Sequence, residues 1–247
     1  MLGVFMALSS LGAADAPSAA ETAYAKGDFA TAAEKWQEEV RNEGPTSGLL
    51  AALGNAEWKL GRKGRAIVCW ERALLLDPRD LVALAGLRHA QNAGGTERPA
   101  ANWYETYSIT LGTDTWLILA TASFWTALLG VLMPRLLRRP ANEWNQRSRV
   151  AAVTLFVLCL PGLWGAHTQA ARAVVRMNEV SLRLTPTALG EPMVAIAEGD
   201  VVRTGRSFNG HIQVKTSTGK TGWVRAGEIE SIWGGGLPMD LDAKAAP

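Results

Sequence analysis

The stretch that decides the fold of the N-terminal third is LLAALGNAEWKLGRKGRAIVCWERALLLDP, from Leu49 to Pro78. Its apolar residues follow a helical spacing that Gly61 interrupts near the middle, which predicts two helices joined by a short turn. An earlier copy of the pattern lies 34 residues upstream, and the matching pairs are Gly27 and Gly61, Tyr24 and Trp58, Ala32 and Ala66, and Trp36 and Trp70. A repeat of this length predicts stacked helix pairs.

The second copy resembles the tetratricopeptide repeat family, whose members share this period. The residues that carry the resemblance are Leu50, Leu53, Gly54, Ala66, Trp70, Ala73 and Pro78. Gly54 and Ala66 allow two helices to approach closely, and Pro78 ends the second helix. The first copy departs from the pattern at Glu39 and Gly44, but we expect its helix pair to form.

A further helix is expected after the second copy, because Asp80 can cap a segment that carries Leu81, Leu84 and Leu87. These leucines are expected to cover the exposed face of the second pair. Residues 17–92 are therefore predicted to form an all-α tetratricopeptide domain of about five short helices. The alternative is an amphipathic helical bundle without tetratricopeptide geometry.

The composition limits the function classes that are open to this chain. Its 247 residues include 25 Lys and Arg against 23 Asp and Glu, a balance that excludes a generic electrostatic binder of nucleic acid. Two cysteines exclude a disulfide framework. The length is divided among modules that are too small for most enzyme folds.

Residues 1–14 are predicted to be a signal peptide, because the apolar run from Leu2 to Ala14 is shorter than a membrane span and ends in small residues. Cleavage is expected after Ala14. No Lys or Arg precedes the run, so an unprocessed N-terminal helix is the alternative. Residues 93–112 contain AGGTERPAAN and the aromatic residues Trp103, Tyr104 and Tyr107, and we interpret them as a linker and juxtamembrane segment.

Two uncharged apolar stretches near the middle of the chain predict a transmembrane α-hairpin. Thr115 to Met133 is close to the length of about 20 residues that a helix needs to cross the hydrocarbon layer. Val150 to Ala171 is the second stretch, and three residues are expected to bend it: Pro161, Gly162 and Gly165. The predicted spans are residues 113–134 and 150–171. The alternative is a pair of buried helices in a soluble core, but the flanking modules are too small to surround them.

The segment between the two spans, residues 135–149, indicates the orientation of the hairpin. It has a net charge of +4, with one acidic residue, Glu143, against Arg135, Arg138, Arg139, Arg147 and Arg149. The net charge is −3 for residues 14–114 and +1 for residues 172–247. Because short positive loops stay in the cytoplasm, we predict a cytoplasmic loop. Both terminal modules would then lie on the other face of a bacterial inner membrane, in the periplasm.

The C-terminal module, residues 177–233, consists of short apolar runs separated by Gly and Pro, as small all-β barrels require. The order VSLRLTP, AEGDVV, NGHIQV and GKTGWV resembles a bacterial SH3 domain. His211 stands where that family usually has Trp, and Ser181 and Leu184 also depart from its pattern. Ligand binding by the barrel is therefore an open question. Residues 234–247 are predicted to be a disordered tail.

Recognition, rather than catalysis, is the chemistry that the sequence favours. It has no HExxH, GxSxG or phosphate-loop motif and no paired CxxC, so we predict no enzyme activity, no cofactor and no metal site. In the repeats, Asn55, Trp58 and Lys59 are the candidate protein-binding residues of a concave groove. The alternative is that Trp58 packs within the repeats and that the other two are solvated.

A second candidate surface lies on the barrel, where Arg183, His211 and Trp223 would form a peptide-binding groove. A purely structural role for Trp223 is the alternative. Cys69 and Cys159 are interpreted as buried thiols that cannot reach one another.

The order of the modules resembles BatE-type proteins of bacterial aerotolerance operons. The sequence is then a multidomain membrane protein with tetratricopeptide helix pairs, a transmembrane α-hairpin and a small SH3-like barrel. The resemblance implies a membrane-anchored scaffold that acts beside von Willebrand factor A-type membrane proteins and a MoxR-type ATPase. The alternative function is binding or sensing of peptidoglycan by the barrel.

Overall fold

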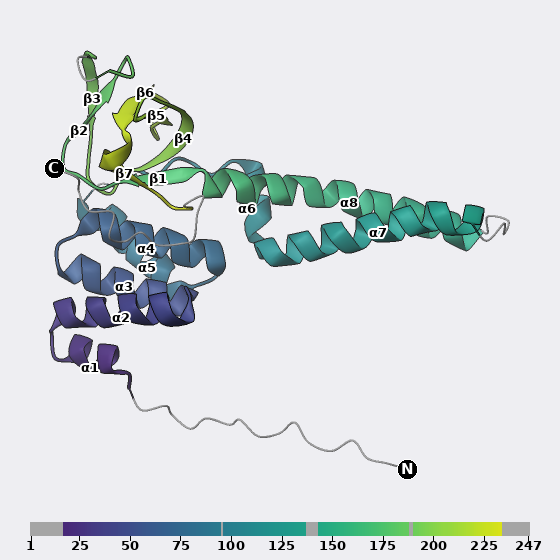
Figure 1. The fold of residues 1–247 in the computed structure, drawn as a ribbon, viewed down its shortest axis with the longest axis horizontal. Helices are drawn as coiled ribbons and strands as arrows, with labels where there is room; N and C mark the ends of the chain where they lie inside the picture. Colours follow the sequence, from purple (N-terminus) through teal and green to yellow (C-terminus); the bar gives the residue numbers. More distant parts are fainter. Residues whose placement is uncertain (1–16, 95, 137–142, 188–189, 234–247) are drawn as a thin grey trace, which may run out of the picture.

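The computed structural model describes residues 17–94, 96–136, 143–187 and 190–233. Figure 1 shows a stack of helices with a sheet packed on one side of it and a long helical hairpin that projects away from both. We refer to the helical stack and the sheet together as the head. The predicted signal peptide, residues 138 and 139 of the arginine-rich segment, and the predicted tail lie outside the described residues.

The helical stack contains the five short helices that the repeats predict: α1 (Ala19–Ala25), α2 (Phe29–Glu43), α3 (Ser47–Lys59), α4 (Lys63–Leu76) and α5 (Leu81–Gly94). The side chains of Ser18, Asp28 and Thr46 cap the first three by accepting a backbone N–H. Gly27 and Gly61 have positive φ angles of 81° and 78° in the turns within the two pairs. The first pair forms despite its departures from the repeat pattern.

Helix α5 is capped by Asp80 as expected, because its carboxylate accepts the N–H groups of Val82 and Ala83 at 2.9 and 3.0 Å. Its buried face differs from the expected row of leucines. Leu87 is buried with Ala83 and Ala90, but Leu81 is 76% exposed. The prediction that Leu81 covers the second pair is therefore wrong.

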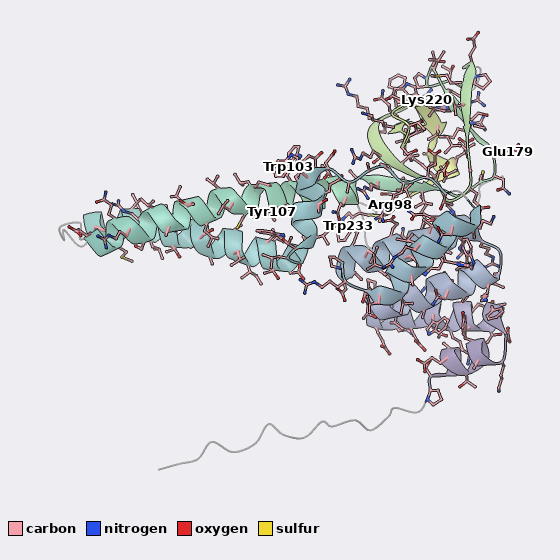
Figure 2. All side chains as sticks on the ribbon, turned by 180° about the vertical axis from the view of Figure 1, so that it is seen from behind. Arg98, Trp103, Tyr107, Glu179, Lys220 and Trp233 are labelled. Atoms are coloured by element: carbon pink, nitrogen blue, oxygen red, sulfur yellow. The ribbon has the colours of Figure 1, made fainter. Side chains whose placement is uncertain are left out.

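Residues 97–112 form ordered structure against the sheet, although the sequence indicated a linker. Glu97 donates its N–H to Asp200 and accepts one from Val201 at 2.8 and 3.0 Å. The segment continues into helix α6 (Trp103–Ile109), which packs along the hairpin. Figure 2 shows Trp103 and Tyr107 on this helix beside the hairpin, and Arg98 between the sheet and the helical stack.

The hairpin consists of α7 (Thr113–Leu136) and α8 (Glu143–Ala170), and both helices are long and apolar enough to cross a membrane by length and composition. Most of their side chains are exposed rather than enclosed by the head. Arg147 and Arg149 belong to the first turns of α8, not to the connecting loop that the sequence indicated. The backbone of Arg135 lies in the last turn of α7.

Helix α8 continues through Pro161, Gly162 and Gly165, where the sequence predicted a bend. The two glycines allow close packing. A β-carbon at Gly162 would lie 2.7 Å from the Trp116 ring, and one at Gly165 would collide with the carbonyl of Tyr104. The N-terminal end of α7 and helix α6 can therefore both lie directly against α8.

The C-terminal module is a seven-stranded antiparallel sheet in the order β3-β2-β6-β5-β4-β1-β7. The strands are β1 (Arg172–Val175), β2 (Val180–Arg183), β3 (Pro192–Ile196), β4 (Val201–Phe208), β5 (His211–Lys215), β6 (Thr221–Arg225) and β7 (Ile229–Ser231). A short 3₁₀ helix, η1 (Ala226–Glu228), precedes β7. The sheet begins five residues before the predicted start at residue 177, immediately after α8. Asn209 and Gly210, both with positive φ, form the tight turn between β4 and β5.

The sheet and the helical stack share one hydrophobic core. Val174, Val201 and Ile232 of the sheet module are buried in the same cluster as Ile67 and Trp70 of α4. Polar contacts close the edges of this interface: the N–H of Gly64 donates to Glu198 at 2.9 Å, and Arg72 binds the carbonyls of Ser231 and Ile232 at 3.0 Å and the carboxylate of Glu230 at 3.0 Å. The head is therefore one packed body rather than two modules on a flexible linker.

Candidate functional site

A groove on the helical stack brings the predicted recognition residues together. It has a volume of about 510 Å³ and is lined by Tyr24, Asn55, Trp58, Lys59, Trp70, Leu81, Val82, Ala85, Gly86 and His89. These residues come from α1, α3, α4 and α5. Helices α1 and α3 are the first helices of the two pairs, and α5 follows the second pair; in tetratricopeptide repeats the first helices line the concave side.

The floor of the groove is the indole of Trp70, which is buried. Glycines on two neighbouring helices make room for it, since a β-carbon at Gly54 would lie 2.6 Å from Trp70 Nε1 and one at Gly86 would collide with the ring. The indole N–H donates to Asn55 Oδ1 at 3.2 Å. This bond satisfies a buried donor and fixes the orientation of both side chains.

The wall of the groove is aromatic. The ring of Trp58 is tilted against Trp70, with centroids 5.7 Å apart, and His89 meets Trp58 edge to face at 5.5 Å. Trp58 is partly buried, so it packs within the repeats and also lines the groove. The packing that the sequence left as the alternative for Trp58 is present, and its predicted role in protein binding stays a prediction.

The three predicted residues contribute differently to this surface. Asn55 uses its carbonyl oxygen to hold Trp70, which leaves its amide N–H₂ as the group that can face a ligand. Lys59 is exposed at the rim, and none of the described residues that line the groove is acidic. An apolar segment that carries a carboxylate therefore fits this lining best. Leu81 and Val82, which the sequence did not single out for binding, supply exposed apolar surface at the other end.

The three predicted barrel residues lie on the face of the sheet that points away from the barrel core. Trp223 on β6 is directly opposite Arg183 on β2 and Gln213 on β5, and the alternating residues Leu182, Val214 and Val224 belong to the core cluster. His211 is two residues along β5 from Gln213, which makes it a diagonal neighbour of Trp223.

His211 is the least accessible of the three. It is buried, its Nδ1 is 2.9 Å from the carbonyl oxygen of Asn209, and its Nε2 has no hydrogen-bond partner among the described residues. His211 directly follows the Asn209–Gly210 turn, which accounts for the contact of its Nδ1 with the carbonyl oxygen of Asn209. Arg183 and Trp223 are both partly exposed, so they form the accessible part of this surface.

A buried ionic cluster, which the sequence did not predict, joins the head to the hairpin. Glu105 of α6 is fully buried, and its carboxylate binds Arg172 at 2.9 Å and Arg203 at 3.0 Å. It also accepts the backbone N–H of Asn102 at 2.9 Å. Burial lowers the pKa of Arg172, and the neighbouring carboxylates of Glu71 and Glu105 oppose that shift.

The position of Glu105 explains its importance for the arrangement of the modules. Its backbone carbonyl accepts the side-chain amide of Gln169, near the end of α8, at 2.9 Å. One residue of α6 therefore contacts the end of the hairpin, the first strand and β4. In the sequence, Glu105 stands out only through its spacing from Asn102, which is that of a helix capping box. That spacing does not indicate whether the carboxylate is buried.

The other titratable groups in the described part of the chain offer no comparable site. Burial raises the pKa of the Cys69 thiol to about 12, as expected for a buried structural cysteine. Cys159 is buried in the hairpin, and both cysteines are free. Within the described residues, no group of three or more His, Cys, Asp or Glu side chains could hold a metal ion.

The comparison with known families identifies one repeat. Residues 47–80 match the tetratricopeptide repeat model, and they cover α3 and α4, the second copy. No curated protein and no solved structure matches the chain. Tetratricopeptide repeats are non-catalytic and generally mediate protein–protein interactions, so this match and the groove geometry together indicate a protein-interaction module.

Proposed function

We propose that this protein is a membrane-anchored, non-enzymatic scaffold that presents its groove and its sheet to protein partners. The observation that carries the proposal is the groove itself, in which Asn55, Trp58 and Lys59 meet the exposed apolar residues Leu81 and Val82. Aromatic walls, one cationic rim residue and no acidic lining among the described residues favour an apolar peptide segment with a carboxylate.

In this proposal the hairpin is the anchor. Both of its head-side ends, the start of α7 and the end of α8, lie next to α6 and the first strand, so the groove and the sheet share one side of the membrane. A cytoplasmic turn of the hairpin is supported by its positive residues, Arg135, Arg138, Arg139, Arg147 and Arg149. The head is then in the periplasm.

The sheet provides a second contact surface through Arg183 and Trp223, and its strand pattern supports an SH3-like barrel. The order of the modules supports a role like that of BatE-type proteins. The partners in that setting are von Willebrand factor A-type membrane proteins, which can reach the groove with their periplasmic segments, and a MoxR-type ATPase in the cytoplasm. Peptidoglycan binding by the barrel remains the alternative that the experiment below separates.

The test is capture of a co-expressed A-type membrane protein by the intact scaffold in mild detergent. Lys59→Glu reverses the charge at the rim of the groove and is expected to weaken capture roughly tenfold, the effect of losing about 1.4 kcal/mol. Lys26→Glu is the matched control, because Lys26 is exposed in the turn between α1 and α2 and does not line the groove.

Equal capture by the wild type and both variants would refute the assignment of the groove. The peptidoglycan alternative would be favoured by two results together. The wild type would fail to capture the protein, and the intact scaffold would sediment on purified cell wall in a way that Trp223→Ala abolishes.

A further inference from the structure

A patch of exposed apolar residues surrounds the point where the helical stack meets the base of the hairpin. Leu76 and Leu81 belong to the corner between α4 and α5, and Ile109 and Leu111 belong to the corner between α6 and α7. We call these four residues the corner patch. All four side chains are exposed, and Leu81 is the most exposed of them.

One hydrogen bond joins the two corners of this patch. Arg79 Nη2 donates to the backbone carbonyl oxygen of Thr110 at 3.2 Å. Thr110 lies three residues before α7 begins, and the uncharged stretch of α7 starts at Thr115. Thr110 is therefore five residues before the start of the apolar span, so the Thr110 side of the corner patch lies next to that span.

With the hairpin inserted as proposed, the Thr110 side of the corner patch lies in or next to the layer of lipid headgroups. The interfacial layer adds about 5–7 Å to each side of the hydrocarbon core. The neighbouring helix α6 has an interfacial composition, since Trp103 is 71% exposed at its first position and Tyr104 and Tyr107 follow. Figure 2 shows Trp103 beside the end of the hairpin that joins the head.

The direction of the helices determines which end of the stack faces the membrane. Consecutive helices of the stack run antiparallel, so the turns at Gly27 and Gly61 lie at the end opposite to the α4–α5 corner. In Figure 1 the connection between α1 and α2 is on the side away from the hairpin. The exposed leucines Leu76 and Leu81 are therefore at the membrane-facing end.

We propose that the corner patch contacts the phospholipid bilayer, with Leu76 and Leu81 inserted among the headgroups and the Arg79 guanidinium beside lipid phosphate. Leu111 of the patch precedes α7, which carries further exposed apolar residues at Leu117 and Ile118. This inference depends on the proposed insertion of the hairpin and goes beyond it, because it makes the helical stack itself a membrane-contacting domain. The end of the groove that contains Leu81 then opens at the bilayer surface.

Spin labels on single introduced cysteines test this contact. The full-length protein is reconstituted in vesicles of phosphatidylethanolamine and phosphatidylglycerol, and labels are attached at Leu76→Cys, Leu81→Cys, Leu129→Cys or Lys26→Cys. Collision rates are measured with oxygen, which concentrates in lipid, and with a water-soluble nickel chelate. The native Cys69 and Cys159 are fully buried, and the unmodified protein serves as the labelling blank.

We expect a higher oxygen-to-nickel collision ratio at Leu76 and Leu81 than at Lys26, and the highest ratio at Leu129 within the hairpin. Ratios at Leu76 and Leu81 equal to that at Lys26, with a high ratio at Leu129, would overturn this inference and leave the membrane anchor intact. A low ratio at Leu129 would instead overturn the insertion of the hairpin and the proposed function with it.

Discussion

Substitution of Glu105 by Gln is the most direct test of the head–hairpin junction. Gln keeps the shape of the side chain but removes the charge that two arginines share, and Arg172 stays buried without its partner. Removal of one partner from a buried ion pair costs about 3–5 kcal/mol of unfolding free energy. For a protein of this size, we therefore expect the melting temperature to fall by roughly 6–20 °C.

The matched control is Glu143→Gln, which breaks the ion pair between Glu143 and Arg147 at 3.4 Å. Both side chains are largely exposed, so the pair contributes only about 0.3–0.5 kcal/mol and the melting temperature is expected to change by about 2 °C or less. Thermal unfolding of the detergent-solubilised protein, followed by tryptophan fluorescence, measures both variants under the same conditions.

A double substitution separates the loss of a charge pair from the loss of packing. Glu105→Gln with Arg172→Gln removes the uncompensated positive charge, so we expect it to destabilise the protein by less than the sum of the single substitutions. Equal effects of Glu105→Gln and Glu143→Gln would refute the reasoning, because the carboxylate of Glu105 would then be as well solvated as an exposed one.

The remaining predictions concern packing, thiol chemistry and orientation. Gly64→Ala is expected to lower the unfolding free energy by about 1–3 kcal/mol, because the new β-carbon would lie 2.8 Å from a backbone oxygen of the sheet. Gly48 has open space around it, so Gly48→Ala should be neutral or stabilising. Chemical denaturation measures both variants. The Cys69 thiol, whose pKa burial raises to about 12, should not react with a thiol reagent at pH 8 until the protein is unfolded, and mass spectrometry of the labelled peptide checks this. A cysteine at Gln146 should react with an impermeant reagent only when the cytoplasmic face is open, and one at Lys26 only from the opposite face; labelling of both from one face would refute the hairpin topology.

The elements that the sequence predicted are those that local periodicity specifies. The 34-residue offset between Trp36 and Trp70 predicted two helix pairs, and Asp80 predicted the start of α5. The length and lack of charge of two apolar stretches predicted α7 and α8. In each case the signal lies within one element or between equivalent positions of a repeat, where spacing alone carries the information.

The contacts between modules could not be predicted in this way. Residues 93–112 have the composition of a linker, yet Glu105 in that segment holds Arg172 and Arg203, which are 67 and 98 positions later in the chain. The sequence predicted only a bend at Gly162 and Gly165, and the positions of Trp116 and Tyr104 show that these glycines allow close packing. Burial of a charge depends on what the rest of the chain places around it, and a single sequence does not contain that information.

The fusion of the helical stack with the sheet changes how the two proposed binding surfaces can act together. Two modules on a flexible linker would each bind independently and would lose linker entropy when both engage one partner. Here the shared core around Ile67 and Val174, and the bonds of Arg72 to β7, fix the groove relative to the row of Arg183 and Trp223. The junction at Glu105 fixes both relative to the hairpin. A partner that contacts both surfaces must match one fixed geometry, so in the proposed membrane scaffold the specificity would depend on orientation as well as on the chemistry of each surface.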